Sequence, residues 1–421
     1  MTLRVLFVSQ WFPPEPYLLP LDIASSLADA GCEVTVLTGI PNYPSGDVLP
    51  GYSPWRGSRE RIAGLPVLRA PLFPSHDHSG AKRAANYLSF AASSALRALS
   101  PRLHFDVSLV FSSPITAAGP AVAAQLVRRA PYVMMVQDLW PNVVYESGLL
   151  GSGDHPWARR ALDAACLNVY RRASTCFAIT PGMRADLLAM GVPAERLRPF
   201  WNWGPAEGRE VGPPDSSLRS LIQAEANDLV LVYAGNMGTT HALDAWVTAI
   251  ATRERTQPDA RRVHLVFLGD GLARKGLEEL ARQEGCRSVH FLGRMDDQTF
   301  LAYRNAADAN VVSLMPSPVF DTSMPSKIPD TLAHGGLLIG AVRGDAASII
   351  EESGGIVATD ISPQAIEWAI DRLAGLPASE IADRRSQGKN LYEQRMSRAV
   401  GTEALVTALY EAASKGTDRS P

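Results

Sequence analysis

The chain lacks long apolar runs and is poor in cysteine. No segment approaches the ~20 consecutive apolar residues that span a bilayer, and the apolar run at residues 5–8 is too short for the core of a signal peptide. The four cysteines, Cys32, Cys166, Cys176 and Cys286, show no metal-ligand spacing. We therefore expect a cytoplasmic protein with reduced, buried thiols and no disulfide.

The chain also lacks a strong charge of either sign and an Asp-x-Asp motif. Its net charge is −3, which gives no reason to expect nucleic acid as a partner. Asp296 and Asp297 are adjacent rather than spaced, so metal-bridged diphosphate chemistry is disfavoured, and we expect neither a metal site nor a cofactor. A length of 421 residues, with 46% apolar and 20% charged residues, predicts a globular protein of two domains.

Apolar, strand-like runs alternate with helical patterns from end to end. Residues 4–9 and 33–38 flank an amphipathic segment at residues 21–30 that Gly31 ends, which is the βαβ opening of a parallel sheet. The region 204–214 is rich in Gly, Pro and Glu and has no apolar periodicity, so we interpret it as a linker. Further strands are predicted at residues 107–111, 132–136, 175–179, 229–234, 263–268, 289–292, 309–314, 337–342 and 356–358.

This alternation predicts an α/β protein with two Rossmann-like domains. We place the first domain at residues 1–204 and the second at residues 205–395. In residues 396–421 we expect a final helix that returns to the first domain and then a frayed polar tail.

The most informative segment is residues 324–336, which follow a buried-strand pattern. Ser326 is a suitable N-cap and Pro329 is tolerated in a first helical turn, and a Gly-Gly pair ends the helix. Lys327 and Asp330 therefore lie at a helix N-terminus just beyond the carboxyl end of a parallel strand. That arrangement suits a diphosphate, with the acid holding a ribose. The plainer interpretation is an ordinary turn with a surface lysine.

Short motifs follow the predicted strands in both halves of the chain. They are Pro41-Asn42-Tyr43-Pro44-Ser45-Gly46, Asp138-Leu139-Trp140-Pro141, Ile179-Thr180-Pro181-Gly182, Trp201-Asn202-Trp203, Tyr233-Ala234-Gly235-Asn236-Met237-Gly238, Leu268-Gly269-Asp270-Gly271, Phe291-Leu292-Gly293-Arg294 and Pro325-Ser326-Lys327-Ile328. In this order they resemble the family-four retaining glycosyltransferases of the GT-B fold. The branch they resemble most adds sugars in bacterial surface-polysaccharide and amino-sugar pathways. The resemblance covers most of the chain and implies two Rossmann-like domains that face each other across a cleft.

The resemblance implies transfer of a sugar from a UDP- or GDP-linked donor to an acceptor, with retention of anomeric configuration and without a metal ion. Lys327 and Asp138 are the predicted catalytic residues. Donor binding is predicted for Gly235, Asn236, Met237, Gly238, Asp270, Gly271, Gly293, Arg294, Met295, Ser323, Met324, Pro325, Ser326, Lys327 and Asp330. Acceptor binding is predicted for Trp11, Tyr17, Tyr43 and Asp138.

The donor half departs from the wider family at charged positions. Of the family's two spaced glutamates, the second falls on Asp330 and the first on Thr322. The family's Arg and Lys after the Tyr-Ala-Gly strand are replaced by Asn236 and His241. One basic clamp is thus missing or weakened, and Lys327 is the residue expected to supply the lost charge.

Several predicted site residues have a plainer interpretation. In the first domain Gln137 replaces the family's histidine, so the carboxylate of Asp138 takes its place near the reaction centre. Asp138 either acts on the acceptor or the reacting sugar, or caps the helix that begins at Trp140. Asp270 and the turn at residues 235–238 are either donor contacts or tightly packed turns, and the first-domain aromatics either hold the acceptor or pack under loops.

Residues 51–103 are basic in a chain that is acidic overall. They hold eight basic and two acidic residues, a difference of +6. A helix at residues 81–99 carries part of this charge with a weakly apolar face, which favours slight peripheral contact with an anionic membrane. The alternative is a helix packed on the sheet. The acceptor is accordingly either a lipid-linked or polysaccharide intermediate, or a small soluble thiol, cyclitol or natural-product intermediate.

Two other functions fit the same architecture. One is a nucleotide-sugar epimerase or hydrolase, and the other is a non-catalytic nucleotide-sugar-binding partner. The motifs that begin at Asp138 and at Pro325 favour transfer.

Overall fold

The chain divides into two compact units. The computed structural model describes residues 2–75, 79–146, 156–204, 207 and 217–417. Unit 1 comprises Met1–Trp201 and Arg398–Pro421, and unit 2 comprises Asn202–Ser397. These limits lie close to the boundaries placed from the sequence. Most of the predicted linker at residues 204–214 lies outside the described residues, as does the end of the predicted tail.

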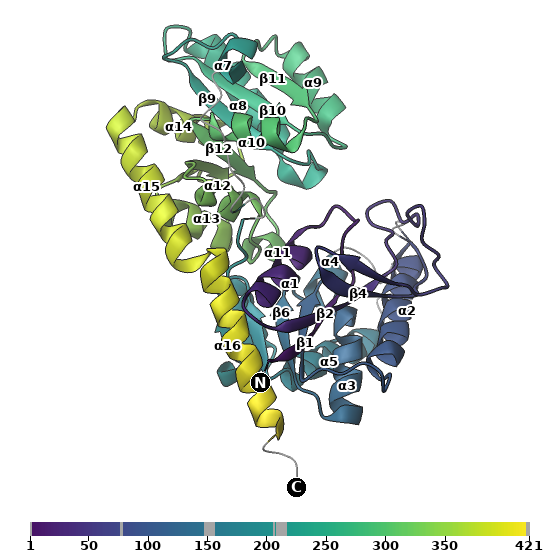
Figure 1. The fold of residues 1–421 in the computed structure, drawn as a ribbon. Helices are drawn as coiled ribbons and strands as arrows, with labels where there is room; N and C mark the ends of the chain where they lie inside the picture. Colours follow the sequence, from purple (N-terminus) through teal and green to yellow (C-terminus); the bar gives the residue numbers. More distant parts are fainter. Residues whose placement is uncertain (1, 76–78, 147–155, 205–206, 208–216, 418–421) are drawn as a thin grey trace. The chain divides into compact units, whose positions relative to one another are not determined.

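Unit 1 is built on an eight-stranded sheet in the order β3-β4-β2-β1-β5-β6-β7-β8 (Figure 1). All neighbouring strands run parallel except β3 and β4. Every residue of β5 and β6 is buried, which explains why these strands show continuous apolar runs instead of alternation. The strands are β1 (Arg4–Ser9), β2 (Glu33–Gly39), β3 (Arg59–Ile62), β4 (Leu65–Ala70), β5 (Val107–Ser112), β6 (Tyr132–Val136), β7 (Thr175–Ala178) and β8 (Leu197–Pro199).

Helices from both ends of the chain pack on this sheet. The C-terminal helix α16 (Arg398–Thr417) contacts α1, β5 and β6, and the Arg398 guanidinium lies 3.3 Å from Asp29 and 3.5 Å from Asp22 of α1. Unit 1 is therefore closed by residues far apart in the sequence. Its other helices are α1 (Leu19–Asp29), α2 (Gly80–Ala98), α3 (Gly119–Arg128), α4 (Asn142–Glu146), α5 (Pro156–Arg172) and α6 (Pro181–Ala189).

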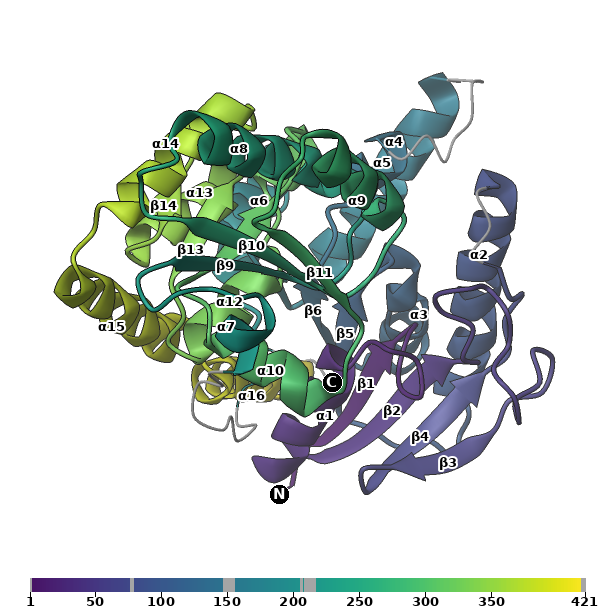
Figure 2. The same ribbon diagram turned by 90° about the horizontal axis from the view of Figure 1, so that it is seen from above.

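Unit 2 holds a six-stranded parallel sheet in the order β11-β10-β9-β12-β13-β14 (Figure 2). The chain leaves β9 toward one edge through β10 and β11, then returns to the other side of β9 with β12. Ligands of such sheets bind beyond the carboxyl ends of the strands at this reversal point. The strands are β9 (Leu229–Ala234), β10 (Val263–Leu268), β11 (Val289–Gly293), β12 (Ala309–Ser313), β13 (Leu338–Ala341) and β14 (Ile356–Val357).

The core of unit 2 lies between the sheet and its covering helices. Tyr233, Trp246 and Phe267 are among the largest fully buried side chains and belong to one apolar cluster. The helices are α7 (Ser217–Leu221), α8 (Leu243–Thr256), α9 (Arg274–Gln283), α10 (Asp297–Asn305), α11 (Pro318–Asp321), α12 (Lys327–Ala333), α13 (Gly344–Glu352), α14 (Pro363–Ala374) and α15 (Ala378–Arg395).

The predicted fold class, two parallel-sheet α/β domains, is confirmed, and three strands were missed. β3 is a charged edge strand that forms an antiparallel hairpin with β4, and its turn residues Ala63 and Gly64 both have positive φ. Charged, short edge strands lack the apolar pattern of buried ones. The third, β8, spans three residues and ends in Pro199 at the other edge of the sheet.

Candidate active site

Lys327 begins α12 beside the carboxyl ends of β9 and β12, at the reversal point of the unit 2 sheet. Its Nζ lies 4.6 Å from the centre of the Tyr233 ring, and a Cβ placed on Gly235 would lie 3.4 Å from the same atom. Burial lowers the pKa of Lys327 from 10.5 to about 8, and no carboxylate counteracts this lowering. An ammonium group that is buried without an anionic partner is suited to bind an anionic ligand.

The glycine turn after β9 is held against two neighbouring turns. A Cβ on Gly269 would lie 2.3 Å from the carbonyl oxygen of Gly235, and one on Gly271 would lie 2.4 Å from that of Met237. Gly269 and Gly235 both have φ near +120° (121° and 124°), so glycine is required there for space and conformation. Met237 itself is fully buried in the core, so its side chain cannot contact a ligand.

Most backbone amides of this turn donate hydrogen bonds within the protein. The Gly235 amide donates to Leu268 and the Met237 amide to Asp270, at 2.8 and 2.9 Å. The Gly238 amide donates to Nδ1 of His241 at 3.1 Å. These three amides are therefore not available to phosphate in this conformation, and tight packing explains much of the turn.

The loop before α12 shows the same restriction. The Ser323 amide donates to the Phe320 carbonyl at 3.2 Å, and Pro325 has no amide hydrogen to donate. Ser326 occupies the N-cap position as predicted, but its side chain makes no capping hydrogen bond. Of the backbone amides of Ser323, Met324 and Ser326, those of Met324 and Ser326 are left as candidates for a phosphate.

Asp330 faces an arginine that was not foreseen. The Arg304 guanidinium on α10 forms an ion pair with the Asp330 carboxylate, and only 4% of the Arg304 side chain is exposed. Arg304 also donates to His334 at 3.0 Å, while its buried Nε has no partner among the described residues. Lys327, Arg304 and Asp330 line one cavity of about 30 Å³ with Asn310, enough for a water molecule.

The remaining predicted donor residues lie at the ends of β10 and β11. Asp270 accepts a hydrogen bond from the Gly271 amide at 2.9 Å and lies 3.8 Å from the exposed guanidinium of Arg294. Gly293 has φ of +74°, and Met295 packs partly against an apolar cluster beside the sheet. Asp270 thus stabilises its own turn, which agrees with the plainer of the two interpretations.

His241 does not replace the missing basic clamp. Burial and the charge of Lys327 lower its pKa, so the imidazole is neutral at neutral pH. Asn236 is exposed and carries no charge. The charge of Arg304 is paired with Asp330, whereas Lys327 has no carboxylate partner in the part of the chain that the structure describes.

The predicted acceptor residues of unit 1 lie together. The Trp11 ring lies 5.2 Å from Tyr43 and 6.3 Å from Tyr17, measured between ring centres. Asp138 is near enough to raise the pKa of Tyr17, although burial is the larger cause. The Ser113 hydroxyl donates to the Asp138 carboxylate at 2.5 Å, whereas burial raises the pKa of Asp138. The structure thus brings the three aromatic rings and the partly buried Asp138 carboxylate together in unit 1.

Glu15 organises the loops that carry these aromatics. Its buried carboxylate accepts hydrogen bonds from the amides of Phe12, Asn42 and Tyr43, each at 2.9 Å. One carboxylate therefore ties the loop after β1 to the loop after β2. Burial raises the pKa of Glu15, and these hydrogen bonds oppose the shift.

Sequence reasoning missed the partners of the site residues. Tyr233 belongs to one of the motifs named above, but its contact with Lys327 depends on which strands are neighbours in the sheet. Arg304 does show a signal, because it lies three residues after buried Leu301 on the core-facing stripe of α10. Glu15 is the acidic residue in an otherwise apolar, proline-rich loop, which also distinguishes it. Ser113 gives no such signal.

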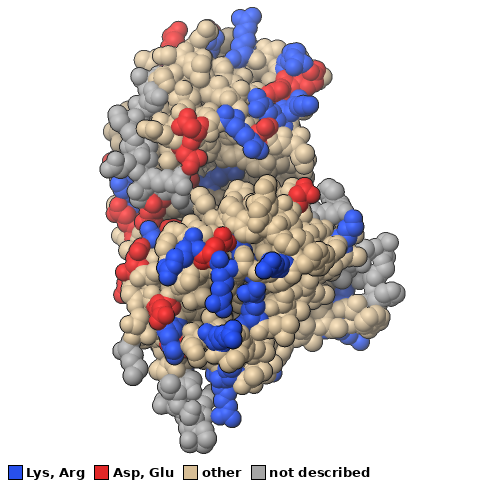
Figure 3. Space-filling view, turned by 45° about the vertical axis from the view of Figure 1, so that its right-hand side comes forward, with Lys and Arg blue, Asp and Glu red and all other residues tan. Residues whose placement is uncertain are grey.

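The basic region at residues 51–103 is less basic at the surface than its sequence suggests. Arg69 is fully buried, pairs with Glu60 at 2.6 Å, and donates to the carbonyls of Phe12 and Gly39. Figure 3 shows Lys and Arg side chains gathered on the visible face of unit 1. Helix α2 adds exposed Leu88 and Leu96 to this region. Within the described part of the chain, no helix has the length and apolar character needed to cross a membrane.

Among the described residues, the cysteine and acidic side chains form no cluster typical of a metal site. Across residues 2–75, 79–146, 156–204, 207 and 217–417, no group of three or more His, Cys, Asp or Glu side chains could hold a metal ion. Cys32, Cys166 and Cys176 are buried free thiols, but Cys286 is only partly buried and donates to Glu254.

Two family models match the chain in succession. Residues 19–203 match a glycosyl transferase 4-like domain, and residues 228–375 match the glycosyl transferases group 1 domain. WcaI of Escherichia coli (strain K12), a putative colanic acid biosynthesis glycosyl transferase, is 29% identical over 353 residues, which cover 81% of this chain and 83% of WcaI.

Solved structures show the same fold over nearly the whole chain. HepE from Anabaena, in complex with UDP and glucose, matches with a TM-score of 0.67 and 17% identity, over 97% of this chain and 99% of its own. Sucrose-phosphate synthase from Thermosynechococcus elongatus matches with a TM-score of 0.68 and 15% identity, over 98% of each chain. The resemblance drawn from the motifs is thereby confirmed for family and fold: the chain is a GT-B glycosyltransferase of the family that joins a glycosyl transferase 4-like domain to a group 1 domain.

Proposed function

We propose that this glycosyltransferase moves a sugar from a UDP- or GDP-linked donor to a carbohydrate-type acceptor in polysaccharide biosynthesis, with retention of anomeric configuration and without a metal ion. The observation that carries the proposal is the buried ammonium group of Lys327, which has no carboxylate partner among the described residues and lies at the reversal point of the unit 2 sheet. The HepE complexes with UDP, and WcaI's description in colanic acid biosynthesis, support the donor and acceptor classes.

Lys327 stabilises the leaving diphosphate. Negative charge grows on the diphosphate oxygens as the glycosidic bond breaks, and a donor already placed there needs no reorganisation. The backbone amides of Met324 and Ser326, in the loop before α12, add neutral donors beside it. Because the lysine itself supplies positive charge, this route needs no bridging divalent cation. Asp330 binds the ribose from a fixed position, since Arg304 holds its carboxylate.

The argument for retention of anomeric configuration concerns the group that takes the proton of the attacking acceptor hydroxyl. The leaving phosphate itself can take the proton of the acceptor hydroxyl when that hydroxyl attacks the face from which the phosphate departs. Gln137 cannot act as a base in place of the family's histidine. Asp138, hydrogen-bonded to Ser113, then orients the acceptor and stabilises the positive charge that develops on the transferred sugar.

The aromatic cluster of Trp11, Tyr17 and Tyr43 favours a carbohydrate acceptor. Aromatic faces pack well against the apolar C–H faces of sugar rings. A lipid-linked sugar is consistent with the basic residues and the exposed Leu88 and Leu96 of residues 51–103, which would add weak contact with an anionic bilayer. A small soluble acceptor would use the same aromatic cluster without that surface.

The test is acceptor-dependent release of nucleoside diphosphate. The full chain is incubated with UDP- and GDP-sugars, with and without a lipid-extracted or soluble acceptor fraction. We expect UDP or GDP and a glycosylated acceptor only when all components are present, and a much lower rate for Lys327→Ala. Isomerised donor would instead identify an epimerase. Release without acceptor would identify a hydrolase, and donor binding without turnover would identify a binding protein.

A further inference from the structure

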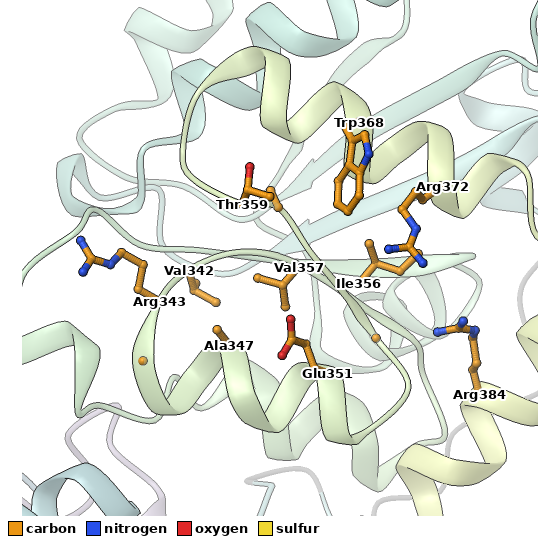
Figure 4. A pocket seen from close by; sticks show the side chains of 13 residues that line it. Val342, Arg343, Ala347, Glu351, Ile356, Val357, Thr359, Trp368, Arg372 and Arg384 are labelled. Atoms are coloured by element: carbon orange, nitrogen blue, oxygen red, sulfur yellow. The ribbon is translucent and has the colours of Figure 1, made fainter.

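A groove runs along the free edge of the unit 2 sheet, beside β14. It encloses about 470 Å³, within the range of about 300–1,000 Å³ that small-molecule sites occupy. The edge strand forms its floor, and α13, α14 and α15 supply its walls (Figure 4). Neither Lys327 nor any other predicted donor residue lines it, so the groove is separate from the candidate donor site.

Backbone groups of the edge strand face this groove. The Ala358 amide donates to Gly340 of β13 at 2.8 Å, and β13 and β14 are parallel. In a parallel ladder, the residue before Ala358 directs its backbone amide and carbonyl away from β13. Val357 therefore presents one donor and one acceptor toward the groove, where a polar ligand can bind them.

Two arginines lie on one side of the groove with hydrogen-bonding capacity left over. Arg372 forms no ion pair among the described residues, and its guanidinium lies 5.0 Å from the centre of the Trp368 ring. Arg384 is fixed by Glu380 at 2.8 Å and by the Gly354 carbonyl at 2.9 Å. A guanidinium has five N–H groups, so Arg384 can still donate to an anion. Figure 4 shows both side chains beside Ile356.

The rest of the groove offers groups for a hydroxyl-bearing ring. Trp368 is 45% exposed, and in Figure 4 its indole stands over the edge strand. The carboxylate of Glu351 points toward the groove from α13, on the opposite wall. A carboxylate accepts hydrogen bonds from hydroxyl groups, and an indole face packs on a sugar ring.

We propose that this groove binds a phosphorylated monosaccharide. Its phosphate lies between Arg372 and Arg384, its ring packs on Trp368, and its hydroxyls donate to Glu351. Of the three arginines that line the groove, Arg343 pairs with Asp321 and Arg384 with Glu380, so Arg372 supplies the charge that a phosphate would meet and Arg384 adds N–H donors. An uncharged sugar would leave Arg372 without an anionic partner, and inorganic phosphate would leave Trp368 and Glu351 without contacts.

The test is isothermal titration of the full chain with a panel of hexose 1-phosphates and 6-phosphates. UDP or GDP, whichever nucleotide the protein binds, is kept in excess so that a hexose phosphate cannot occupy the donor site. We expect at least one member to bind, with inorganic phosphate and the matching free hexose each weaker by about tenfold or more. Arg372→Gln and Trp368→Ala should each weaken binding by about tenfold or more.

The matched control is Arg287→Gln. Arg287 is an exposed arginine before β11, at the opposite edge of the same sheet, so its replacement should leave binding unchanged. If no hexose phosphate binds at millimolar concentration, the proposal is wrong. It is equally wrong if binding survives Arg372→Gln and Trp368→Ala, or if inorganic phosphate binds as tightly as the sugar phosphates. Far-UV circular dichroism of each variant shows whether a loss of binding reflects unfolding.

Discussion

Replacing Lys327 by methionine should stabilise the free protein while it removes function. Burial lowers the pKa of Lys327 from 10.5 to about 8, and this lowering corresponds to a cost of about 3 kcal/mol for the charged form. Methionine keeps an unbranched apolar chain against Tyr233 and carries no charge to desolvate. We therefore expect Lys327→Met to raise the free energy of unfolding by about 1–3 kcal/mol, allowing for incomplete burial.

The same variant should lose catalysis and nucleotide-dependent stabilisation. Removing one preorganised donor to a developing oxyanion lowers kcat by about 10²–10³. The native protein should gain about 2.7 kcal/mol at a UDP or GDP concentration of about 100 times the dissociation constant, whichever nucleotide it binds. Lys327→Met should gain much less, because it lacks the charge that the diphosphate meets. Enzymes recurrently have active sites that lower the stability of the free protein, and ligand binding compensates for that loss.

The lowered pKa of Lys327 also predicts how the stability of the native protein, relative to Lys327→Met, changes with pH. Folded Lys327 titrates near 8 and unfolded lysine near 10.5, so the unfolded chain binds more protons between these values. Stability of the native protein should therefore rise with pH in this window relative to Lys327→Met. The apparent kcat/KM for the donor should fall above pH 8, as the ammonium loses its proton, and Lys327→Arg should move this fall to higher pH.

Denaturant unfolding and steady-state kinetics of the native protein and the two variants test these statements. Lys327→Ala is the control for packing, since it removes the charge and also leaves a cavity. A Lys327→Met protein less stable than the native one would refute the desolvation argument. A donor kcat/KM that stays flat to pH 9.5 would show that the charge of Lys327 is not used.

Four further outcomes are expected. Asp330→Asn should cost about 3–5 kcal/mol in denaturant unfolding, because Arg304 keeps a buried charge without its partner; a cost below 1 kcal/mol would contradict this. Turnover should be unchanged in EDTA, and restoration of a lost rate by Mg²⁺ would overturn the metal-free route. NMR of the product should show an α-linkage from an α-linked donor, and a β-linkage would exclude retention. The pKa of His290 is lowered to about 4 by burial and by His264, so stability should fall as pH drops from 6.5 toward 4, by about 1–2 kcal/mol; a His290→Gln protein should lose less.

The sequence predicted buried parallel strands well because their pattern is local. Residues 132–136 and 263–268 are predicted and observed with the same limits, and both are continuous apolar runs with covered faces. The hairpin of β3 and β4 was missed because one of its strands is charged and lies at the edge. The exposed side chains of that strand face solvent instead of a core, so the sequence shows no apolar periodicity there.

The positions of the candidate site residues were more predictable than their partners. Lys327 and Asp138 follow strand ends, and parallel topology alone brings strand ends to one edge of a sheet. The contacts that set their chemistry come from elsewhere in the chain: Tyr233 lies under Lys327, and Ser113 donates to Asp138. Such pairs depend on which strands are neighbours, which local patterns do not state.

Asp330 shows how the missing information changes a prediction. From the sequence, its carboxylate lies in the first turn of a helix, where it is expected to hold a ribose. In the structure the same carboxylate also neutralises Arg304, whose side chain is almost wholly buried. Replacing Asp330 therefore alters stability and donor binding together, and a loss of activity alone would not assign the ribose contact. Paired replacement of Arg304 and Asp330 by uncharged residues separates the two, since it removes the buried charge along with its partner.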